Sequence, residues 1–93
     1  MRTIERTNQF KRDYKRELKG QHRATLEDDL VEVVKALARD VPLAERYHDH
    51  ALTGDWKNFR DCHIKPDLVL IYQKPDDRVL QLVRLGSHSE LGL

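Results

Sequence analysis

Residues 56–85 read WKNFRDCHIKPDLVLIYQKPDDRVLQLVRL, and the pattern of this stretch decides the fold. Polar and apolar residues alternate in its first part, and a short, nearly continuous apolar run follows. The first pattern is typical of a half-buried strand and the second of a central strand. Two turn-forming segments with the sequences KPD and PDD separate the runs. We therefore expect an antiparallel meander of three strands, Trp56–Ile64, Leu68–Gln73 and Arg78–Leu85.

Upstream of the meander, the apolar spacing predicts two helices. In residues 9–19 the apolar side chains recur at every fourth position, and in residues 24–39 they cover one helical face. Thr7 or Asn8 can cap the first helix, and Gly20 is expected to end it.

A short strand over residues 2–6 completes the expected fold. The chain is expected to form a single α+β domain over residues 1–93, with the order β-α-α-β-β-β. A small antiparallel sheet then carries both helices on one face, because their apolar stripes need a common surface to cover them.

Length and composition exclude several classes of protein. The 93 residues allow one small domain, and the longest apolar run is far shorter than the ~20 residues that cross a bilayer. The single cysteine, Cys62, excludes an intramolecular disulfide and a zinc site built from cysteines alone. We therefore expect a soluble protein of the reducing cytoplasm that does not associate with a membrane.

Charge is unevenly distributed along the chain, although the formal net charge is only +1. Residues 1–23 carry eight basic and three acidic side chains, whereas residues 24–32 carry four acidic and no basic ones. Two interpretations are open: two solvated helix faces, or a basic surface that contacts phosphate groups. In the second case the candidate RNA-binding or ribosome-binding residues are Lys11, Lys15, Lys57, Arg60 and Lys65.

Histidine and aspartate supply the candidate chemistry, because the ordinary pKa of histidine, about 6.5, lies near neutrality. His63 and Asp67 flank one turn of the meander, and Asp61 shares a strand face with His63 because the two are two residues apart. His50 precedes the meander and His88 follows it. Loops decide whether these two histidines reach the same edge of the sheet.

Each candidate also has a purely structural interpretation. Asp67 follows a turn proline, where aspartate is favoured because it bonds its own backbone, and Asp61 can pair with a neighbouring cation. His22 and His48 are expected to be surface residues without a role. The tryptophan and phenylalanine at the start of the meander are expected to pack in the core or on the sheet rather than to stack on bases.

Two blocks of the sequence resemble a known family. Residues 48–72, HDHALTGDWKNFRDCHIKPDLVLIY, look like the central block of the YafQ-type toxins. Residues 84–91, RLGSHSEL, resemble the Arg-x-Gly-Ser/Thr-His segment near the C-terminus of the same toxins. These toxins belong to the RelE/ParE superfamily of bacterial toxin–antitoxin systems. The resemblance implies a RelE-like fold of one strand, two helices and three strands.

The same resemblance implies a function. It implies the toxin of a type II toxin–antitoxin system, an endoribonuclease (mRNA interferase) that enters the ribosomal A site, cuts mRNA and inhibits translation. The implied partners are a cognate antitoxin protein, in a hetero-oligomer, and the ribosome with its mRNA. Contact with operator DNA is implied only through the antitoxin, and no cofactor or metal ion is implied.

The functional positions of the family match residues of both blocks: the catalytic residues His50, His63, Asp67 and His88, the supporting carboxylate Asp61 and the phosphate-contacting Arg84. Metal-independent RNA cleavage needs a base for the 2′-hydroxyl, an acid for the leaving 5′-oxygen and positive charge at the phosphate. We expect His88 to be the acid and either Asp67 or His63 the base. His50 is then a second proton-transfer or orienting group, and Arg84 stabilises the transition state. The expected product is a 2′,3′-cyclic phosphate.

The sequence departs from the family at its C-terminus, and two other functions are open. Family members carry a substrate-contacting Phe after the Leu of the C-terminal segment, whereas Gly92 and Leu93 stand here. One alternative is a catalytically weak or inactive binding module for the antitoxin or the ribosome. The other is a zinc hydrolase that uses His48, His50 and His63, although their spacing matches no metal signature.

Overall fold

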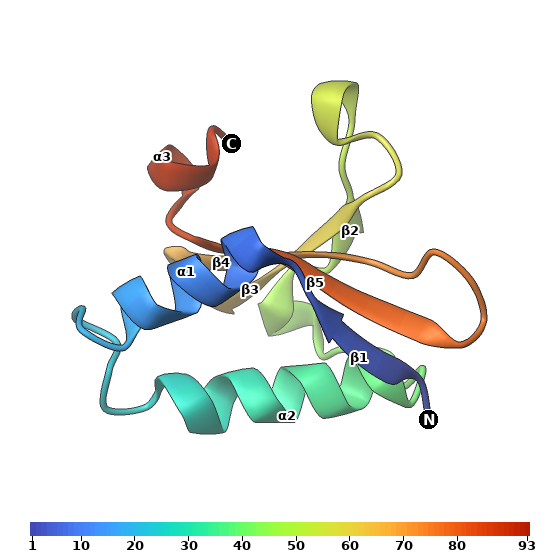
Figure 1. The fold of residues 1–93 in the computed structure, drawn as a ribbon, viewed down its shortest axis with the longest axis horizontal. Coiled ribbons are helices and arrows are strands. Elements are labelled where there is room, and N and C mark those ends of the chain that lie inside the picture. Colours follow the sequence, from blue (N-terminus) through green and yellow to red (C-terminus); the bar gives the residue numbers. More distant parts are fainter.

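The computed structural model describes all 93 residues. Five strands form one mixed sheet in the order β1-β5-β4-β3-β2 (Figure 1). The elements, where η marks a short 3-10 helix, are β1 (Thr3–Arg6), α1 (Asn8–Glu17), α2 (Leu26–Ala38), η1 (Glu45–Tyr47), β2 (His50–Ala51), η2 (Gly54–Trp56), β3 (Arg60–Lys65), β4 (Leu68–Gln73), β5 (Val79–Gly86) and α3 (His88–Leu91). The α+β class and the order of the six predicted elements are confirmed. No helix combines the length and the apolar character needed to cross a membrane.

The sheet contains the predicted antiparallel meander, β3-β4-β5, but it is not antiparallel throughout. β1 pairs in parallel with β5, with Ile4 opposite Leu80. The prediction of an antiparallel sheet was therefore wrong at this edge. Tight turns make the strands that they join antiparallel, whereas β1 is linked to β5 only through the rest of the chain and has no such constraint.

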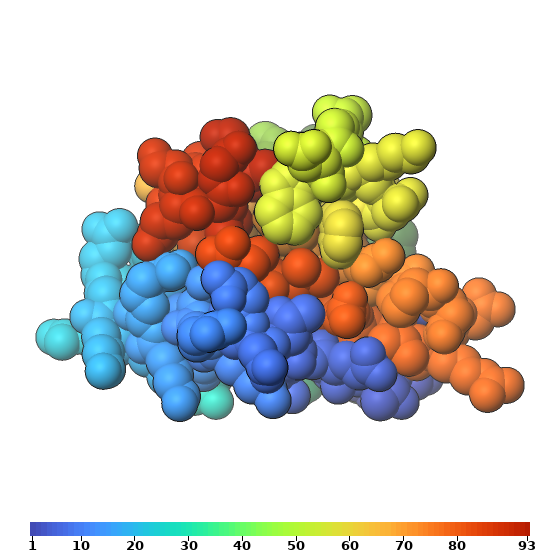
Figure 2. All heavy atoms as spheres, turned by 45° about the horizontal axis from the view of Figure 1, so that its top comes forward, coloured from blue at the N-terminus to red at the C-terminus, as the bar shows by residue number.

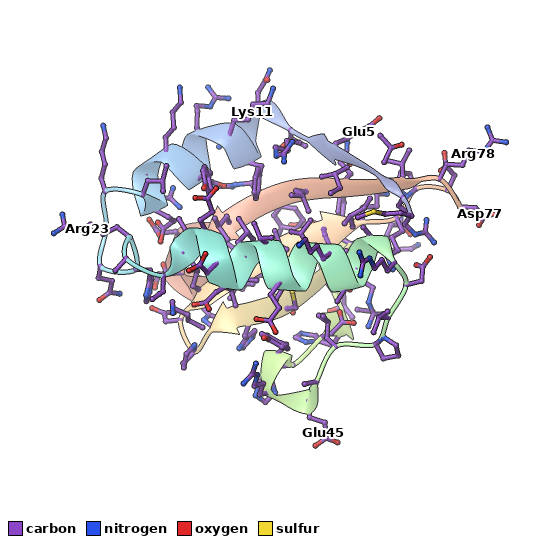
Figure 3. All side chains as sticks on the ribbon, turned by 90° about the horizontal axis from the view of Figure 1, so that it is seen from below. Glu5, Lys11, Arg23, Glu45, Asp77 and Arg78 are labelled. Atoms are coloured by element: carbon purple, nitrogen blue, oxygen red, sulfur yellow. The ribbon has the colours of Figure 1, made fainter.

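Both predicted helices cover one face of the sheet. Figure 3 shows α2 lying across this face with α1 beside it. The side chains buried between the helices and the sheet form the main core: Phe10, Leu26, Leu30, Val33, Val34, Leu37, Ala38, Cys62, Ile64, Leu68, Leu70, Tyr72, Leu80, Leu82 and Leu85. The predicted packing of two helices on one face is thus confirmed.

The ends of α1 follow from its capping. The hydroxyl of Thr7 accepts a hydrogen bond from the backbone N–H of Phe10 at 3.0 Å, so Thr7 is the N-cap. The helix ends at Glu17, earlier than expected from Gly20. The reason is that the N–H groups of Lys19 and Gly20 bond carbonyls three residues back, which tightens the chain into a turn.

The opposite face of the sheet carries a second, smaller core. Val69 and Ile71 from β4 pack there with Leu91 from α3. The C-terminal segment forms this helix because Ser87 and Glu90 make a capping box. Each side chain accepts a hydrogen bond from the other residue's backbone N–H, at 3.1 and 2.9 Å. The sequence contains the Ser-x-x-Glu pattern that is typical of this cap.

The strand predicted over Trp56–Ile64 is shorter than expected. Gly54 and Asn58 have φ angles of 65° and 87°, which turn the chain through η2, so β3 begins only at Arg60. Trp56 instead packs edge-on against Phe59, with ring centres 5.4 Å apart. The expected packing role of these two aromatic residues is confirmed.

Beyond β1, helix α1 runs along the edge of β5. The hydroxyl of Thr7 donates to the carbonyl oxygen of Val83 at 2.8 Å, and the carboxylate of Asp13 accepts from the N–H of Leu85 at 3.0 Å. These side chains bond backbone groups that a neighbouring strand would otherwise bond. A charged residue of α1 is thereby buried beside the strand that leads to α3.

Candidate active site

Sheet register places the candidate residues on the face opposite α1 and α2. Residues directly opposite each other in paired strands point to the same side. His63 lies opposite Val69, and Asp61 lies opposite Ile71. Because Val69 and Ile71 pack under α3, Asp61 and His63 share the face that carries α3. Their common face was predicted from their spacing.

His63 lies at the centre of a group of four histidines. Its ring centre is 4.9 Å from that of His88, 5.2 Å from that of His48 and 6.5 Å from that of His50. In Figure 2 the C-terminal residues (red) and the segment that follows β2 (yellow) stand next to each other above β5. The structure therefore brings His50 and His88, whose positions the sequence left to loops, next to His63 on β3.

His48 also belongs to this group: it is an exposed surface residue, as predicted, but its ring is not isolated from the other histidines. It has a left-handed backbone with φ 48°, and its carbonyl oxygen accepts the Nδ1–H of His50 at 2.7 Å. A spacing of two residues from His50 brings side chains to one side only in an extended segment, and His48 is left-handed, so the sequence carried no local signal for this grouping.

His88 and Asp67 are joined by two hydrogen bonds. Oδ1 of Asp67 accepts from Nδ1–H of His88 at 3.0 Å and from its backbone N–H at 3.3 Å. The bond from the His88 side chain, followed by the backbone bond, lowers the pKa of the Asp67 carboxyl below its ordinary value. Because a carboxylate can only accept, Nδ1 carries a hydrogen, and Nε2 is the nitrogen left to exchange a proton with a ligand.

Asp61 is a buried carboxyl beside His50 and His63. Only 3% of its surface is exposed, and its Oδ1 lies 3.1 Å from Nδ1 of His50. The His50 N–H points at the His48 carbonyl instead, so this contact is electrostatic and Oδ1 accepts no hydrogen bond. Burial raises the pKa of Asp61, against the opposing effect of the imidazoles.

The surroundings of His63 lower the pKa of its imidazole. Burial lowers the pKa of its imidazole, and the nearby Asp61 carboxylate opposes this shift without cancelling it. The neutral form of His63 is therefore retained to a lower pH than in an ordinary histidine. A neutral imidazole near neutral pH can accept a proton.

Asp49 anchors the segment that carries His48 and His50. Its Oδ1 accepts from the hydroxyl of Tyr72 at 2.5 Å and from Nε of Arg60 at 3.3 Å. Tyr72 lies on β4 and is 1% exposed within the main core, so its bond to Asp49 attaches the segment to the sheet. Arg60, a predicted RNA-binding residue, is placed here as the ion-pair partner of Asp49.

Arg84 is bound to a carboxylate on α1. Its Nε donates to Oδ2 of Asp13 at 2.7 Å, and its Nη2 donates to Oδ1 at 3.3 Å. Asp13, 2% exposed, also accepts from Nη1 of Arg16 at 3.0 Å. Nη1 of Arg84 makes no hydrogen bond within the chain and is the group left for a ligand. No local pattern indicated this arrangement, because Asp13 lies in a basic helix and resembles a surface residue.

The other predicted RNA-binding residues lie in separate places. Lys65 forms an ion pair with Asp29 of α2 at 2.6 Å, and Lys57 is exposed in the loop before β3. Lys11 and Lys15 border an apolar groove between α1, α2 and β1. That groove is distinct from the hollow lined by His48 and His63.

The C-terminal residues place an apolar side chain at the end of α3. Gly92 has φ 71° and caps the helix, and the N–H of Leu93 donates to the carbonyl of His88 at 2.9 Å. Leu93 is 41% exposed. Leu93 is therefore about one helical turn from His88 and accessible to a ligand.

The chain matches the model of a known protein family. Residues 2–92 match the model of a family described as the bacterial toxin of type II toxin–antitoxin system, YafQ. The chain belongs to the YafQ toxin family. A relative named mRNA interferase toxin YafQ, from Escherichia coli strain B / BL21-DE3, is 37% identical over 91 residues, which are 97% of this chain and 95% of the relative.

Solved structures of similar toxins share the fold of this YafQ-family chain. A copper-bound mutant toxin from Helicobacter pylori superposes with a TM-score of 0.86 at 42% identity, over 98% of this chain and 99% of that one. The E. coli DinJ-YafQ toxin–antitoxin complex gives a TM-score of 0.81 at 36% identity, over 97% and 96% of the two chains. The RelE-like fold implied by the sequence blocks is thus confirmed.

Proposed function

We propose that this chain is an endoribonuclease that cuts mRNA on the ribosome and so inhibits translation. Its membership of the YafQ toxin family and the name mRNA interferase toxin of its E. coli relatives support this function. The observation that carries the chemistry is the 4.9 Å approach of the His63 and His88 rings, with Asp67 bound to Nδ1 of His88. Two imidazoles this close can act on the two oxygens of one phosphodiester.

In this mechanism His63 is the general base and His88 the general acid. Neutral His63 takes the proton of the 2′-hydroxyl, whose oxygen attacks the adjacent phosphorus. Protonated His88, held at Nδ1 by Asp67, gives its Nε2 proton to the 5′-oxygen as the phosphorus–oxygen bond breaks. The products are a 2′,3′-cyclic phosphate and a 5′-hydroxyl. Asp67 is engaged with His88 and has a lowered pKa, which favours His63 over Asp67 as the base.

The remaining groups orient the substrate and stabilise charge. His50, beside the Asp61 carboxylate, is positioned as a second proton-transfer or orienting group. Arg84 presents Nη1 to the phosphate while Asp13 fixes its other nitrogens. A guanidinium held in place before the reaction stabilises the charge that develops on the phosphate oxygens.

The proposal includes a cognate antitoxin as partner and the bacterial cytoplasm as location. Structures of the E. coli DinJ-YafQ complex, in which a relative is bound to an antitoxin, support the partner. The ribosome and mRNA are the other partners, and operator DNA is reached only through the antitoxin. The location follows from the substrate, since mRNA is translated in the cytoplasm.

Cleavage in a translating bacterial extract tests the function. The purified protein should produce mRNA fragments with breaks inside A-site codons and with 2′,3′-cyclic phosphate ends, and the cognate antitoxin should stop the reaction. Ribosome binding without any cleavage would instead identify a binding module.

Chelation separates this mechanism from a zinc hydrolase. No three or more His, Cys, Asp or Glu side chains of the chain are arranged to hold a metal ion, whereas two relatives from H. pylori are described as copper-bound and metal-bound. A chelator selective for zinc and copper over the magnesium that ribosomes need should leave cleavage unchanged. Loss of activity that added zinc restores would contradict the proposed acid–base mechanism.

Cleavage is expected to persist in mildly acidic solution. Burial lowers the pKa of His63 below the ordinary value of 6.5. The base therefore stays neutral and active at pH 6.5, and activity is lost only at a lower pH. Because the Asp61 carboxylate raises the pKa of His63, Asp61→Asn should move the loss of activity to a still lower pH. Single-turnover cleavage rates and the imidazole proton shifts of His63 in the free protein both measure this. A His63 that titrates at or above 6.5 in the wild type would contradict the assignment.

A further inference from the structure

A hollow of about 550 Å³ opens beside His63. This volume lies in the range that holds a small organic ligand. Side chains from α2, from the turn at η1 and from the turn between β3 and β4 line it: Asp29, Arg46, Tyr47, His48, His63, Ile64, Lys65 and Pro66. Because His48 and His63 belong both to the hollow and to the histidine group, the hollow is continuous with the candidate active site.

The walls of this hollow offer planar and positively charged groups. The guanidinium of Arg46 lies 4.8 Å from the ring centre of Tyr47, and its Nη2 donates to the Tyr47 hydroxyl at 2.8 Å. The imidazole of His48 adds a third planar surface. Aromatic rings, imidazoles and guanidinium planes are the groups on which unstacked RNA bases stack.

The hollow also contains a hydrogen-bond acceptor held in place by an ion pair. Oδ2 of Asp29 binds Nζ of Lys65 at 2.6 Å, which links α2 to the end of β3, and the Asp29 side chain is 37% exposed. Its other carboxylate oxygen can accept from an exocyclic amino group of a base. Positive charge alone would bind any phosphate, whereas an acceptor beside a stacking surface distinguishes one base from another.

The hollow lies next to the proposed catalytic histidines, where a nucleotide adjacent to the cleaved bond would be bound. The His48 ring that lines it is 5.2 Å from His63, and His63 is 4.9 Å from His88. His63, the proposed base, therefore lines the hollow itself, and His88, the proposed acid, is the next side chain along. Tyr47 is half-buried and also packs against the main core, whereas Arg46 and His48 are exposed, so packing of the core does not account for these two side chains.

We propose that this hollow binds the base of a nucleotide adjacent to the cleaved bond and contributes to sequence preference. Arg46, Tyr47 and His48 form the stacking surface. Asp29 accepts from the exocyclic amino group of adenine, cytosine or guanine and so selects against uracil, which lacks one. This inference rests on the proposed endoribonuclease function and adds to it the residues that read the mRNA sequence.

Ribosomes programmed with a randomised A-site codon test the subsite. Wild type should cut with a preference against uracil at one codon position. Tyr47→Leu removes the ring but keeps apolar bulk against the core, and it should lower cleavage of preferred codons by about 5- to 100-fold, the effect of losing one base–aromatic stack. Asp29→Ala should relax the discrimination against uracil at the same position.

The matched control is Glu45→Ala. Glu45 belongs to the same short helix as Tyr47 and is directed away from the body of the molecule (Figure 3), and the change should leave the codon profile unaltered. A wild type that cuts no codon would overturn the endoribonuclease function itself. A wild type that cuts, with Tyr47→Leu and Asp29→Ala keeping its codon profile, would overturn the subsite alone.

A measurement that changes the mRNA instead of the protein does not depend on whether the variants fold. An mRNA with an abasic nucleotide at the discriminated position should be cut by wild type about 5- to 100-fold more slowly than the mRNA with the preferred base. Equal rates on the two mRNAs would overturn the subsite even if every variant of the hollow failed to fold.

Discussion

His88→Ala is expected to reduce mRNA cleavage by about 10²- to 10⁴-fold, because it removes the group that protonates the leaving 5′-oxygen. The change should leave α3 in place. The capping box joins Ser87 and Glu90 without using the imidazole, and the backbone N–H of His88 still donates to Asp67. The measurement is the single-turnover rate on programmed ribosomes.

Two comparisons separate a catalytic loss from a structural one. Ser89→Ala alters an exposed neighbour on α3 and should cut at the wild-type rate. His88→Ala should bind the antitoxin and unfold as the wild type does, and added imidazole should restore part of its activity if the residue transfers a proton. Undiminished cleavage by His88→Ala would remove this residue from the mechanism.

Asp13→Ala is expected to lower the free energy of unfolding by about 3 kcal/mol. The change removes the acceptor of bonds from Arg84, Arg16 and the N–H of Leu85. Breaking a buried ion pair costs about 3–5 kcal/mol. The lower end applies because the side chains of Arg84 and Arg16 are 21% and 40% exposed, so water can solvate part of the charge left behind.

Urea unfolding at two pH values measures this effect. Burial alone would raise the pKa of Asp13, but the hydrogen bonds from Arg84 and Leu85, with the nearby positive charges, bring it below 3.8. The stability that the ionised carboxylate contributes is therefore complete above about pH 4 and is lost as the pH falls through the lower, folded-state pKa. The difference between wild type and Asp13→Ala should shrink in that acidic range.

An exposed aspartate provides the control for Asp13. Asp77 lies in the turn before β5 and is labelled at the edge of the molecule in Figure 3. Asp77→Ala should change the free energy of unfolding by less than about 0.5 kcal/mol. A loss below about 1 kcal/mol for Asp13→Ala, or one that does not depend on pH, would contradict the role assigned to this carboxylate.

Local patterns predicted the elements whose partners are close in sequence. The bounds of β4, Leu68–Gln73, were predicted without error because turns flank this apolar run on both sides. The strand before it was predicted to begin four residues too early, since an alternating pattern does not reveal the positive φ of Asn58. The parallel pairing of β1 could not be predicted from local patterns, because no turn connects β1 with β5.

In the candidate site, too, some features were predicted from the sequence and others depend on the tertiary structure. Spacing placed Asp61 and His63 on one face, and the resemblance to the toxin family supplied the roles expected of His50 and His88. The grouping of His48 with these residues, and the hollow beside it, depend on a left-handed residue and on the anchoring of Asp49 by Tyr72. No local pattern contains these contacts between distant parts of the chain.

The sequence by itself determined the α+β class, the meander, the two long helices and the residue types available for acid–base chemistry. It could do so because hydrophobic periodicity, turn residues and caps act over a few neighbouring positions. Only the tertiary structure decided which histidine meets which carboxylate and that Asp13 on α1 holds Arg84 on β5, 71 residues away. Such pairs arise from sheet register and burial, where a buried charge must find its partner wherever the fold brings one within reach.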